Sequence, residues 1–274
     1  MTRAALFGPA YRLGQALRPW LPRAVRTKLL AARAPGERPR ATRARKMLLL
    51  EGCVQPSVAP GINAAAARVL DRLGVQLLSA PAAGCCGAVR FHLDDQRGAL
   101  AQMRRNIDAW WPYLDDCEAL VITASGCGVT VKDYGHLLAH DSAYAAKAAT
   151  VAALARDLAE VVDALAAPLP VALHIPCTPQ HGQRITGKIE PLLRQAGITL
   201  TACADSHLCC GSAGTYSVLQ PLLAGALRER KLASLEAGAP ALIASANIGC
   251  IAHLQGGTAT PVRHWSELLD DALA

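Results

Sequence analysis

The sequence has 274 residues, of which 52% are hydrophobic, 18% charged and 4% aromatic, and its formal net charge is +7. Ten cysteines fall well short of the share of about 8–10% that marks a disulfide scaffold, so they suit a reducing compartment and metal or redox chemistry. We expect a cytoplasmic protein, because no stretch resembles a signal peptide and no apolar run reaches the roughly 20 residues of a membrane span.

The basic residues gather at the N-terminal end. Residues 1–46 hold 12 of the 28 lysines and arginines and only one of the 21 acidic residues. Such an arm can contact an anionic membrane surface, act as a transit peptide, bind an acidic partner protein or form a solvated linker. Contact with a membrane would be peripheral, at the inner face of the plasma membrane. No stacking aromatic residues or nucleic-acid motif accompany the arm, so we expect no nucleic-acid partner.

In the first half of the chain, short apolar runs alternate with helical patterns. The runs predict buried strands at 47–51, 75–79 and 119–123. Between the last two strands, apolar residues recur at steps of three and four, which predicts a one-faced helix. Its apolar positions are Leu100, Met103, Ile107 and Trp110. A further helical stretch covers 142–166 and ends at Pro168 and Pro170, where we place the seam between two domains.

The second half repeats this alternation. Strands are predicted at 171–175, 198–202 and 241–246, and one helix carries an apolar stripe at Leu219, Leu222, Leu223, Ala226 and Leu227. Pro221 fits that helix only in its first turn. Strands that alternate with helices are typical of parallel sheets covered by helices. The predicted fold class is α/β, with two tandem Rossmann-like units.

Four pairs of cysteines have nearly the same separation in the chain. It is 124 residues for Cys53 and Cys177, for Cys85 and Cys209, and for Cys86 and Cys210, and 123 for Cys127 and Cys250. The flanking residues agree as well, as in GCCG and LCCG. The chain is therefore a duplication. We divide it into a basic arm at 1–46, a first cysteine-rich unit at 47–167 and a second at 168–274.

Each repeated cysteine comes just after a predicted strand. In parallel sheets the carboxyl ends of the strands meet at one edge, where helix N-termini and glycine-rich backbone favour negative charge. Adjacent cysteines are unsuited to bridging each other, because consecutive Cα atoms lie about 3.8 Å apart and disulfides need roughly 4.4–6.8 Å. The eight repeated cysteines are therefore candidate metal ligands, four in each unit.

The residues alone leave three roles open for these thiols: an iron–sulfur cluster, a zinc site, or a structural or thiol-redox role. Structural zinc usually draws its cysteines from short C-x₂₋₄-C knuckles, which the sequence lacks. Adjacent side chains diverge and reach different irons of one cluster more easily than one tetrahedral ion. The two halves need not agree, and zinc in one half stays an alternative.

The stretches around the cysteines, EGCVQPSVAPGINAAAARVLDRLG, PCTPQHGQ and HLCCGSAGTYSVLQP, resemble the cysteine-rich CCG repeats of the glycolate oxidase iron–sulfur subunit family. The resemblance covers roughly residues 47–270 and extends to the heterodisulfide reductase B subunit. It implies an iron–sulfur cluster, of [4Fe–4S] type, bound by the eight cysteines. It also implies an oxidoreductase subunit that passes electrons from flavin-containing partner subunits toward a membrane acceptor, with no catalysis by the isolated chain and no flavin of its own.

The sequence departs from the family pattern in two places. The wider pattern ends in CxxC, but Ala124 and Asn247 stand at the earlier position, so each half has one thiol fewer and a five-thiolate cluster is not expected. The N-terminal ferredoxin module of the glycolate oxidase subunits, with its C-x₂-C-x₂-C-x₃-C runs, has no counterpart. Residues 1–46 resemble the linker that follows that module, which makes a separate ferredoxin module a candidate partner.

The remaining notable residues have simpler explanations. Cys117 and Cys203 fall outside the repeated set and are interpreted as ordinary thiols. His181 and His207 lie beside repeated cysteines and are candidates to hydrogen-bond a sulfur or to bind the metal. We expect packing or solvent exposure for His92, His136 and His253, a hydrogen-bonded core position for His174, and core positions for Trp110 and Trp111.

Two other functions compete with electron transfer. One is a thiol–disulfide enzyme of the heterodisulfide reductase type, acting directly on a disulfide substrate, which the missing CxxC thiols disfavour. The other is a non-redox binding module, in which the repeats form a scaffold with zinc or without metal.

Overall fold

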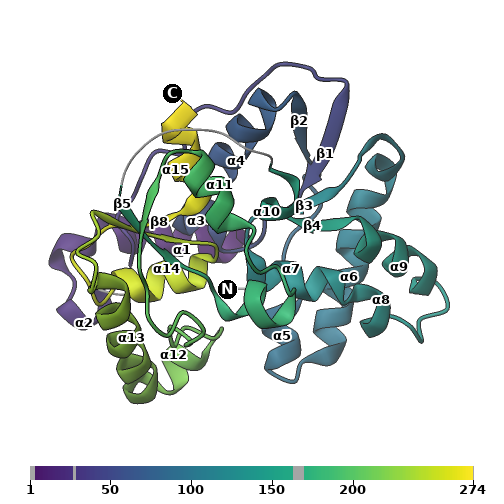
Figure 1. Cartoon of the computed structure of the whole chain (residues 1–274). Coiled ribbons are helices and arrows are strands. Elements are labelled where there is room, and N and C mark those ends of the chain that lie inside the picture. The colour runs from purple at the N-terminus through teal and green to yellow at the C-terminus, as the bar shows by residue number, and fades with distance from the viewer. Residues whose placement is uncertain (1–3, 27–28, 163–169, 274) are drawn as a thin grey trace. The chain divides into compact units, whose positions relative to one another are not determined.

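The computed structural model describes residues 4–26, 29–162 and 170–273, and its chain forms two compact units (Figure 1). Unit 1 contains residues 4–9 and 35–162, and unit 2 contains residues 10–26, 29–34 and 170–273. Each unit has its own sheet, and each is described separately below.

Unit 1 is built on a parallel sheet of four strands. They are β1 (Arg45–Leu49), β2 (Val75–Ser79), β3 (Leu120–Ile122) and β4 (Ala155–Asp157), in the order β2-β1-β3-β4. The register pairs Leu48 with Leu120, and the side chains of both are fully buried. In β1 the three consecutive residues Met47, Leu48 and Leu49 are buried, as expected where a parallel sheet is covered on both faces.

The helices of unit 1 follow its strands in the chain. They are α3 (Gln55–Val58), α4 (Gly61–Arg72), α5 (Ala88–His92), α6 (Gln96–Trp110), η2 (Trp111–Asp116), α7 (Ser125–Lys132), α8 (Tyr134–Leu137), α9 (Ala145–Leu154) and α10 (Leu158–Val161). The apolar stripe predicted for α6 faces the core, where Met103, Ile107 and Trp110 are fully buried. Trp111, expected in the core, is exposed because it begins the 3₁₀ turn after the helix.

Unit 2 has the same sheet plan. Its strands β5 (Pro170–His174), β6 (Thr199–Thr201), β7 (Leu242–Ser245) and β8 (Val262–His264) are parallel and lie in the order β6-β5-β7-β8. Its other elements are η3 (Thr178–Gly182), a single π-helical turn, α11 (Ile189–Gln195), α12 (Tyr216–Leu219), α13 (Pro221–Glu236), α14 (Ile248–Gln255) and α15 (Trp265–Leu273). The predicted α/β class with two parallel sheets is confirmed, and all six predicted strands are present.

The helix predicted over 142–166 is wrong in its second half. Helix α9 ends at Leu154 because residues 155–157 form β4, whose Ala155 pairs with Leu120. A short helix, α10, then restarts with a capping box in which Asp157 accepts from the Ala159 backbone N–H and Glu160 accepts from the Asp157 N–H. Edge pairing of β4 therefore outweighs the helical propensity of this alanine-rich segment. Pro168 lies outside the described residues.

The helix predicted around residues 219–227 forms, with Pro221 in its first turn as expected. Its apolar stripe, however, is not buried. Leu219, Leu222 and Leu223 are exposed, and Val218 beside them is exposed as well. Of this turn only Ala224 is fully buried. Its carbonyl oxygen packs against Gly211, in the loop that carries Cys209 and Cys210.

The described part of the basic arm contains three short helical elements. Its described elements are α1 (Ala4–Ala16), η1 (Arg18–Trp20) and α2 (Arg23–Arg26). Three arginines at its C-terminal end form ion pairs with the body of unit 1: Arg38 with Glu51, Arg43 with Asp71, and Arg45 with Glu118. Residues 38–45 are thus attached to unit 1 and are not a free linker. Within the part of the chain that the structure describes, no helix combines the length and apolarity needed to cross a bilayer.

Candidate metal centres

In unit 1, the four repeated thiols come together at the carboxyl ends of three neighbouring strands. Cys53 follows β1, Cys85 and Cys86 lie in the loop between β2 and α5, and Cys127 is in the first turn of α7, which follows β3. Hydrogen-bonding contacts link them: the Cys85 sulfur accepts from the Cys53 and Cys86 thiols, and the Cys86 thiol also lies within hydrogen-bonding reach of Cys127. The sheet topology therefore gathers the thiols that the sequence predicted to meet.

The hydrogen bonds make Cys85 the preferred thiolate of unit 1. Bonds donated by the Cys53 and Cys86 thiols lower the pKa of Cys85 to about 3, and the Gly87 backbone N–H and the Arg105 charge act in the same direction. The pKa of Cys53 and that of Cys86 are raised, mainly by their thiol hydrogen bonds and by burial. The site thus stabilises negative sulfur, the form that binds metal.

Two polar side chains hold the cysteine loop of unit 1 in place. Asn106, fully buried on α6, accepts a hydrogen bond from the Gly84 N–H at 2.8 Å and donates one to the Cys85 carbonyl at 2.9 Å. The buried Tyr134 hydroxyl donates to the Cys86 carbonyl at 2.8 Å. The loop backbone therefore has its partners within the protein, which leaves the sulfurs available for a ligand.

A partly buried polar network surrounds Glu51, which precedes Cys53 by two residues in the chain. The Glu51 carboxylate accepts hydrogen bonds from Arg38, Ser79 and Asn63. Burial acts to raise the pKa of Glu51, but these hydrogen bonds and the Arg38 charge hold it below its usual value. Glu51 is therefore a stable anion two residues before Cys53 in the chain.

Unit 2 repeats the arrangement of thiols. Cys177 follows β5, Cys209 and Cys210 lie in the loop after β6, and Cys250 is in the first turn of α14, which follows β7. Hydrogen bonds from Cys177 and Cys210 lower the pKa of Cys209 to about 2, and the Gly211 N–H lies 3.4 Å from the Cys209 sulfur. The pKa of Cys177 and that of Cys210 are raised, first by their hydrogen bonds to Cys209 and then by the other thiols and burial.

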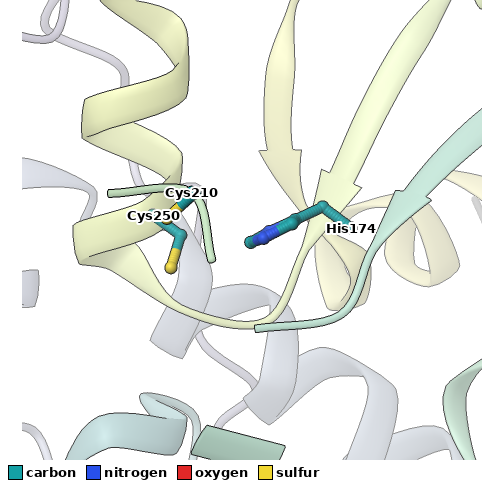
Figure 2. A group of neighbouring side chains, drawn as sticks. All are labelled: His174, Cys210 and Cys250. Atoms are coloured by element: carbon teal, nitrogen blue, oxygen red, sulfur yellow. The ribbon is translucent and has the colours of Figure 1, made fainter. Parts of the chain in front are cut away.

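One further side chain joins the thiols of unit 2. His174, the last residue of β5, offers a ring nitrogen that lies with the sulfurs of Cys210 and Cys250 in a group whose ligand atoms are all within 4.8 Å of one another. Figure 2 shows the imidazole ring extending toward the two cysteines. Among the described residues, this is the one group of three or more histidine, cysteine or acidic side chains that is so compact.

The environment of His174 keeps its ring neutral and oriented. Its Nδ1 lies 2.9 Å from the Ser245 hydroxyl on the neighbouring strand β7. Complete burial lowers the pKa of His174 to about 3, and the Lys231 charge contributes in the same direction. The predicted hydrogen-bonded core position is confirmed, but the sequence interpretation missed that this histidine faces the thiols. The available signal was its position three residues before Cys177.

The other histidines and cysteines singled out from the sequence lie outside the compact group of His174, Cys210 and Cys250. His181 and His207 are exposed and lie outside the compact group, and His92 and His136 are exposed as well. His253 is buried, and its Nε2 lies 3.1 Å from the Ala224 carbonyl. Cys117 is buried, and Cys203 contacts Ser234 and the Ala204 carbonyl.

The two positions that lack the family cysteine are helix N-caps. Asn247 caps α14, with its Oδ1 accepting from the Gly249 N–H at 2.9 Å. Ala124 has the same position before α7 and makes no side-chain cap. In unit 2 the side chain at this position is thus used for helix capping.

The donor set of each unit fits an iron–sulfur centre. Each unit brings four thiols into hydrogen-bonded proximity, with one pKa strongly lowered and with backbone N–H groups at the loop. These features favour the anionic sulfurs that such a cluster requires. In unit 2 the histidine adds a nitrogen donor, so that zinc is also a suitable metal for this donor set.

Comparison with known proteins decides the family. The model of the CCG cysteine-rich domain matches this chain twice, at residues 47–132 and 171–255. The glycolate oxidase iron–sulfur subunit of Escherichia coli is 48% identical over 280 residues, which cover 99% of this chain and 69% of that relative. The chain belongs to the glycolate oxidase iron–sulfur subunit family. This is a family of oxidoreductase subunits with cysteine-rich CCG domains.

The chain is also similar to proteins of lower sequence identity. A probable glycolate oxidase iron–sulfur subunit of Bacillus subtilis is 25% identical over 78% of this chain and 50% of its own length. Lactate utilization protein A of Bacillus velezensis is 28% identical over 77% of this chain and 91% of its own length. A hypothetical protein of Helicobacter pylori shares the fold, with a TM-score of 0.60 at 11% identity over 96% of this chain and 57% of that one.

Proposed function

We propose that this chain is the iron–sulfur electron-transfer subunit of a flavin-dependent 2-hydroxy-acid oxidase complex, with glycolate as the leading substrate. The observation that carries the proposal is the duplicated set of four linked thiols at the carboxyl edge of each parallel sheet. An iron–sulfur cluster bound there supplies one-electron transfer. The flavin resides on partner subunits, which oxidise the hydroxy acid, and the electrons continue toward a membrane acceptor.

The proposed ligands are the repeated cysteines. In unit 1 they are Cys53, Cys85, Cys86 and Cys127, and in unit 2 Cys177, Cys209, Cys210 and Cys250. The chain itself positions these sulfurs, favours one thiolate in each set and buries five of the eight cysteines. We propose a [4Fe–4S] cluster as the cofactor, with zinc in unit 2 as the second candidate because of its nitrogen donor.

The substrate class is drawn from the relatives. The names of two relatives specify glycolate, and that of a third specifies lactate utilization. Both acids carry a hydroxyl group next to the carboxylate, which is the chemistry that a flavin subunit would oxidise. We therefore propose a 2-hydroxy acid as the substrate of the complex and glycolate as the member of that class, given the 48% identity to the E. coli subunit.

We further propose a cytoplasmic location with peripheral contact at the inner face of the plasma membrane. The described part of the basic arm exposes large apolar side chains, among them Leu6, Leu13 and Trp20. Exposed apolar residues combined with positive charge are typical of segments that lie at a lipid surface. A separate ferredoxin module is a further proposed partner, since the arm resembles the linker that follows it.

The test uses the full chain purified without oxygen, alone and together with flavin-containing glycolate oxidase subunits. We expect bound iron and sulfide in the chain alone, visible by colour and elemental analysis. Addition of glycolate should reduce these centres only when the flavin subunits are present, as followed by electron paramagnetic resonance. A chain that stays free of iron after anaerobic reconstitution contradicts the proposal. Disulfide reduction by the isolated chain would instead support the heterodisulfide reductase type of function.

A further inference from the structure

The unit 2 site contains a nitrogen donor with the orientation of a metal ligand. His174 is completely buried, and its ring extends toward Cys210 and Cys250 (Figure 2). Nδ1 is occupied by the hydrogen bond with the Ser245 hydroxyl. When Nδ1 donates its proton to Ser245, Nε2 keeps its lone pair for a metal. Histidines that bind metals commonly have such a partner on the other nitrogen, which fixes the tautomer and the ring orientation.

The first unit has no equivalent of this pair. In unit 2, the strand register places His174 opposite Ser245. In unit 1, Leu48 pairs with Leu120 and Leu49 with Val121, so the same register places Leu50 opposite Ile122. Both of these side chains are buried and apolar. A ligand-type histidine and its orienting hydroxyl thus occur together in unit 2 and are both absent at the matching positions of unit 1.

A packing role alone does not account for this placement. A buried imidazole costs free energy unless its polar atoms have partners, and an apolar pair fills the equivalent space in unit 1. The ring faces the sulfurs of Cys210 and Cys250, and the ligand atoms of the three residues all lie within 4.8 Å of one another. A neutral imidazole nitrogen and thiolate sulfurs are both ligands that zinc and iron accept in proteins.

We propose that His174 binds the metal centre of unit 2 directly through Nε2, together with Cys210 and Cys250, so that the two centres of the chain have different ligand sets. Unit 1 binds its centre through thiolates alone, whereas in unit 2 the imidazole takes the place of one of the four cysteines proposed above, other than Cys210 and Cys250. This inference rests on the proposed metal-binding function. Replacement of an anionic thiolate by a neutral imidazole raises the reduction potential of an iron–sulfur centre. The centre of unit 2 is therefore the stronger electron acceptor of the two.

The test detects the nitrogen itself. The full chain is produced with ¹⁵N-labelled histidine, reconstituted with iron and sulfide, and studied by pulsed electron paramagnetic resonance. We expect a histidine nitrogen coupling that changes with the isotope and that disappears in the double variant His174→Leu with Ser245→Ile. This variant copies the apolar pair of unit 1, so its core remains filled. His264→Leu is the control, because His264 is another fully buried histidine bonded through Nδ1 to a serine, Ser266.

The outcomes separate the two proposals. If iron and sulfide bind but the coupling is absent, or persists in the His174→Leu/Ser245→Ile variant, the histidine proposal is wrong while the proposed function stands. If no iron binds, the proposed function fails. The His174 proposal is then tested separately, by loading Co²⁺ into the metal-free chain and measuring the same histidine nitrogen coupling. As a second readout, His174→Cys should shift the midpoint potential of the unit 2 centre downward and leave that of unit 1 unchanged. An unchanged unit 2 potential would overturn the ligand role.

Discussion

The two units share one sheet plan but support their cysteine loops differently. In unit 1 the loop backbone is held by two neutral side chains, Asn106 and Tyr134. In unit 2 the fully buried Lys231 has this task, and its ammonium group donates to the carbonyls of Asp205 and Ser206 just before the thiols. The comparison shows that duplication kept the positions of the sulfurs while the surrounding charges diverged.

The exposure of the sulfurs differs as well. In unit 1 only Cys127 of the four is half-buried, whereas in unit 2 both Cys177 and Cys209 are half-buried. A half-buried centre is more accessible to solvent and to a redox partner than a buried one. Unit 2 thus combines the more accessible thiols with an additional nitrogen donor.

The largest expected effect comes from removal of the adjacent cysteines. The double variant Cys85→Ser with Cys86→Ser should lose the iron and sulfide of unit 1, and Cys209→Ser with Cys210→Ser those of unit 2, because each pair supplies half of the thiols. Elemental analysis after anaerobic reconstitution measures the loss, with Cys117→Ser as the control outside both sets. Equal and complete loss from both double variants would contradict two independent sites.

Next in size is a substitution at the glycine that follows each pair. Gly211→Ala should destabilise unit 2 by about 3 kcal/mol, because the backbone has φ +87° and the new Cβ would lie 2.5 Å from the Ala224 carbonyl oxygen. Gly87→Ala in unit 1 should cost less, since its nearest neighbours are the flexible Met103 side chain at 3.1 Å and the Ala99 oxygen at 3.2 Å. Denaturant unfolding compares the two.

Gly214→Ala is the matched control for this comparison. Gly214 has φ +61° but no heavy atom within 4 Å of an added Cβ, so only the backbone strain of about 1 kcal/mol remains. A destabilisation by Gly214→Ala as large as that by Gly211→Ala would show that the contact with Ala224 is not the cause.

Loss of the loop support should have an intermediate effect. Asn106→Ala removes the partners of the Gly84 N–H and the Cys85 carbonyl and should destabilise unit 1 by about 2 kcal/mol, without affecting the unfolding of unit 2. Hydrogen exchange at the Gly84 amide measures the effect locally. Unchanged protection of that amide would contradict the assigned role of Asn106.

The smallest expected effect concerns the helix caps. Asn247→Ala should cost about 1 kcal/mol, because it removes the acceptor for the Gly249 N–H. The reverse change in unit 1, Ala124→Asn, should stabilise α7 by a smaller amount. Thermal unfolding of both variants tests whether this position is used for capping, and an unaltered Tm for Asn247→Ala would argue against it.

Much of the fold could be predicted because the chain carries the same signals twice. The apolar runs around Leu48 and Ile243 indicate buried strands. The shared spacing of the cysteines shows which residues of the two halves correspond. Strand β4 could not be found in this way, since Ala155 lies in an alanine-rich run and is a strand only through its pairing with Leu120. The short edge strand depends on a partner that is distant in sequence.

The sequence predicts only the repeated part of the candidate site. The cysteines stood out because they recur, whereas His174 has leucine at the matching position, so comparison of the halves gave it no support. Its significance depends on the distance to Cys210 and Cys250, which follow 36 and 76 residues later in the chain. The exposure of Leu222 was missed for a related reason, since a helical apolar stripe does not reveal which face meets the core.

The Ala224 peptide group contacts two of the segments that form the unit 2 site. The Ala224 carbonyl on α13 packs against the glycine that follows Cys210 and also accepts a hydrogen bond at 3.1 Å from His253, three residues after Cys250 on α14. Movement of this turn of α13 would therefore displace both sulfur-bearing segments together. Because the same turn of α13 also exposes Leu222 and Leu223, a contact made there would be transmitted to the segments that carry Cys210 and Cys250.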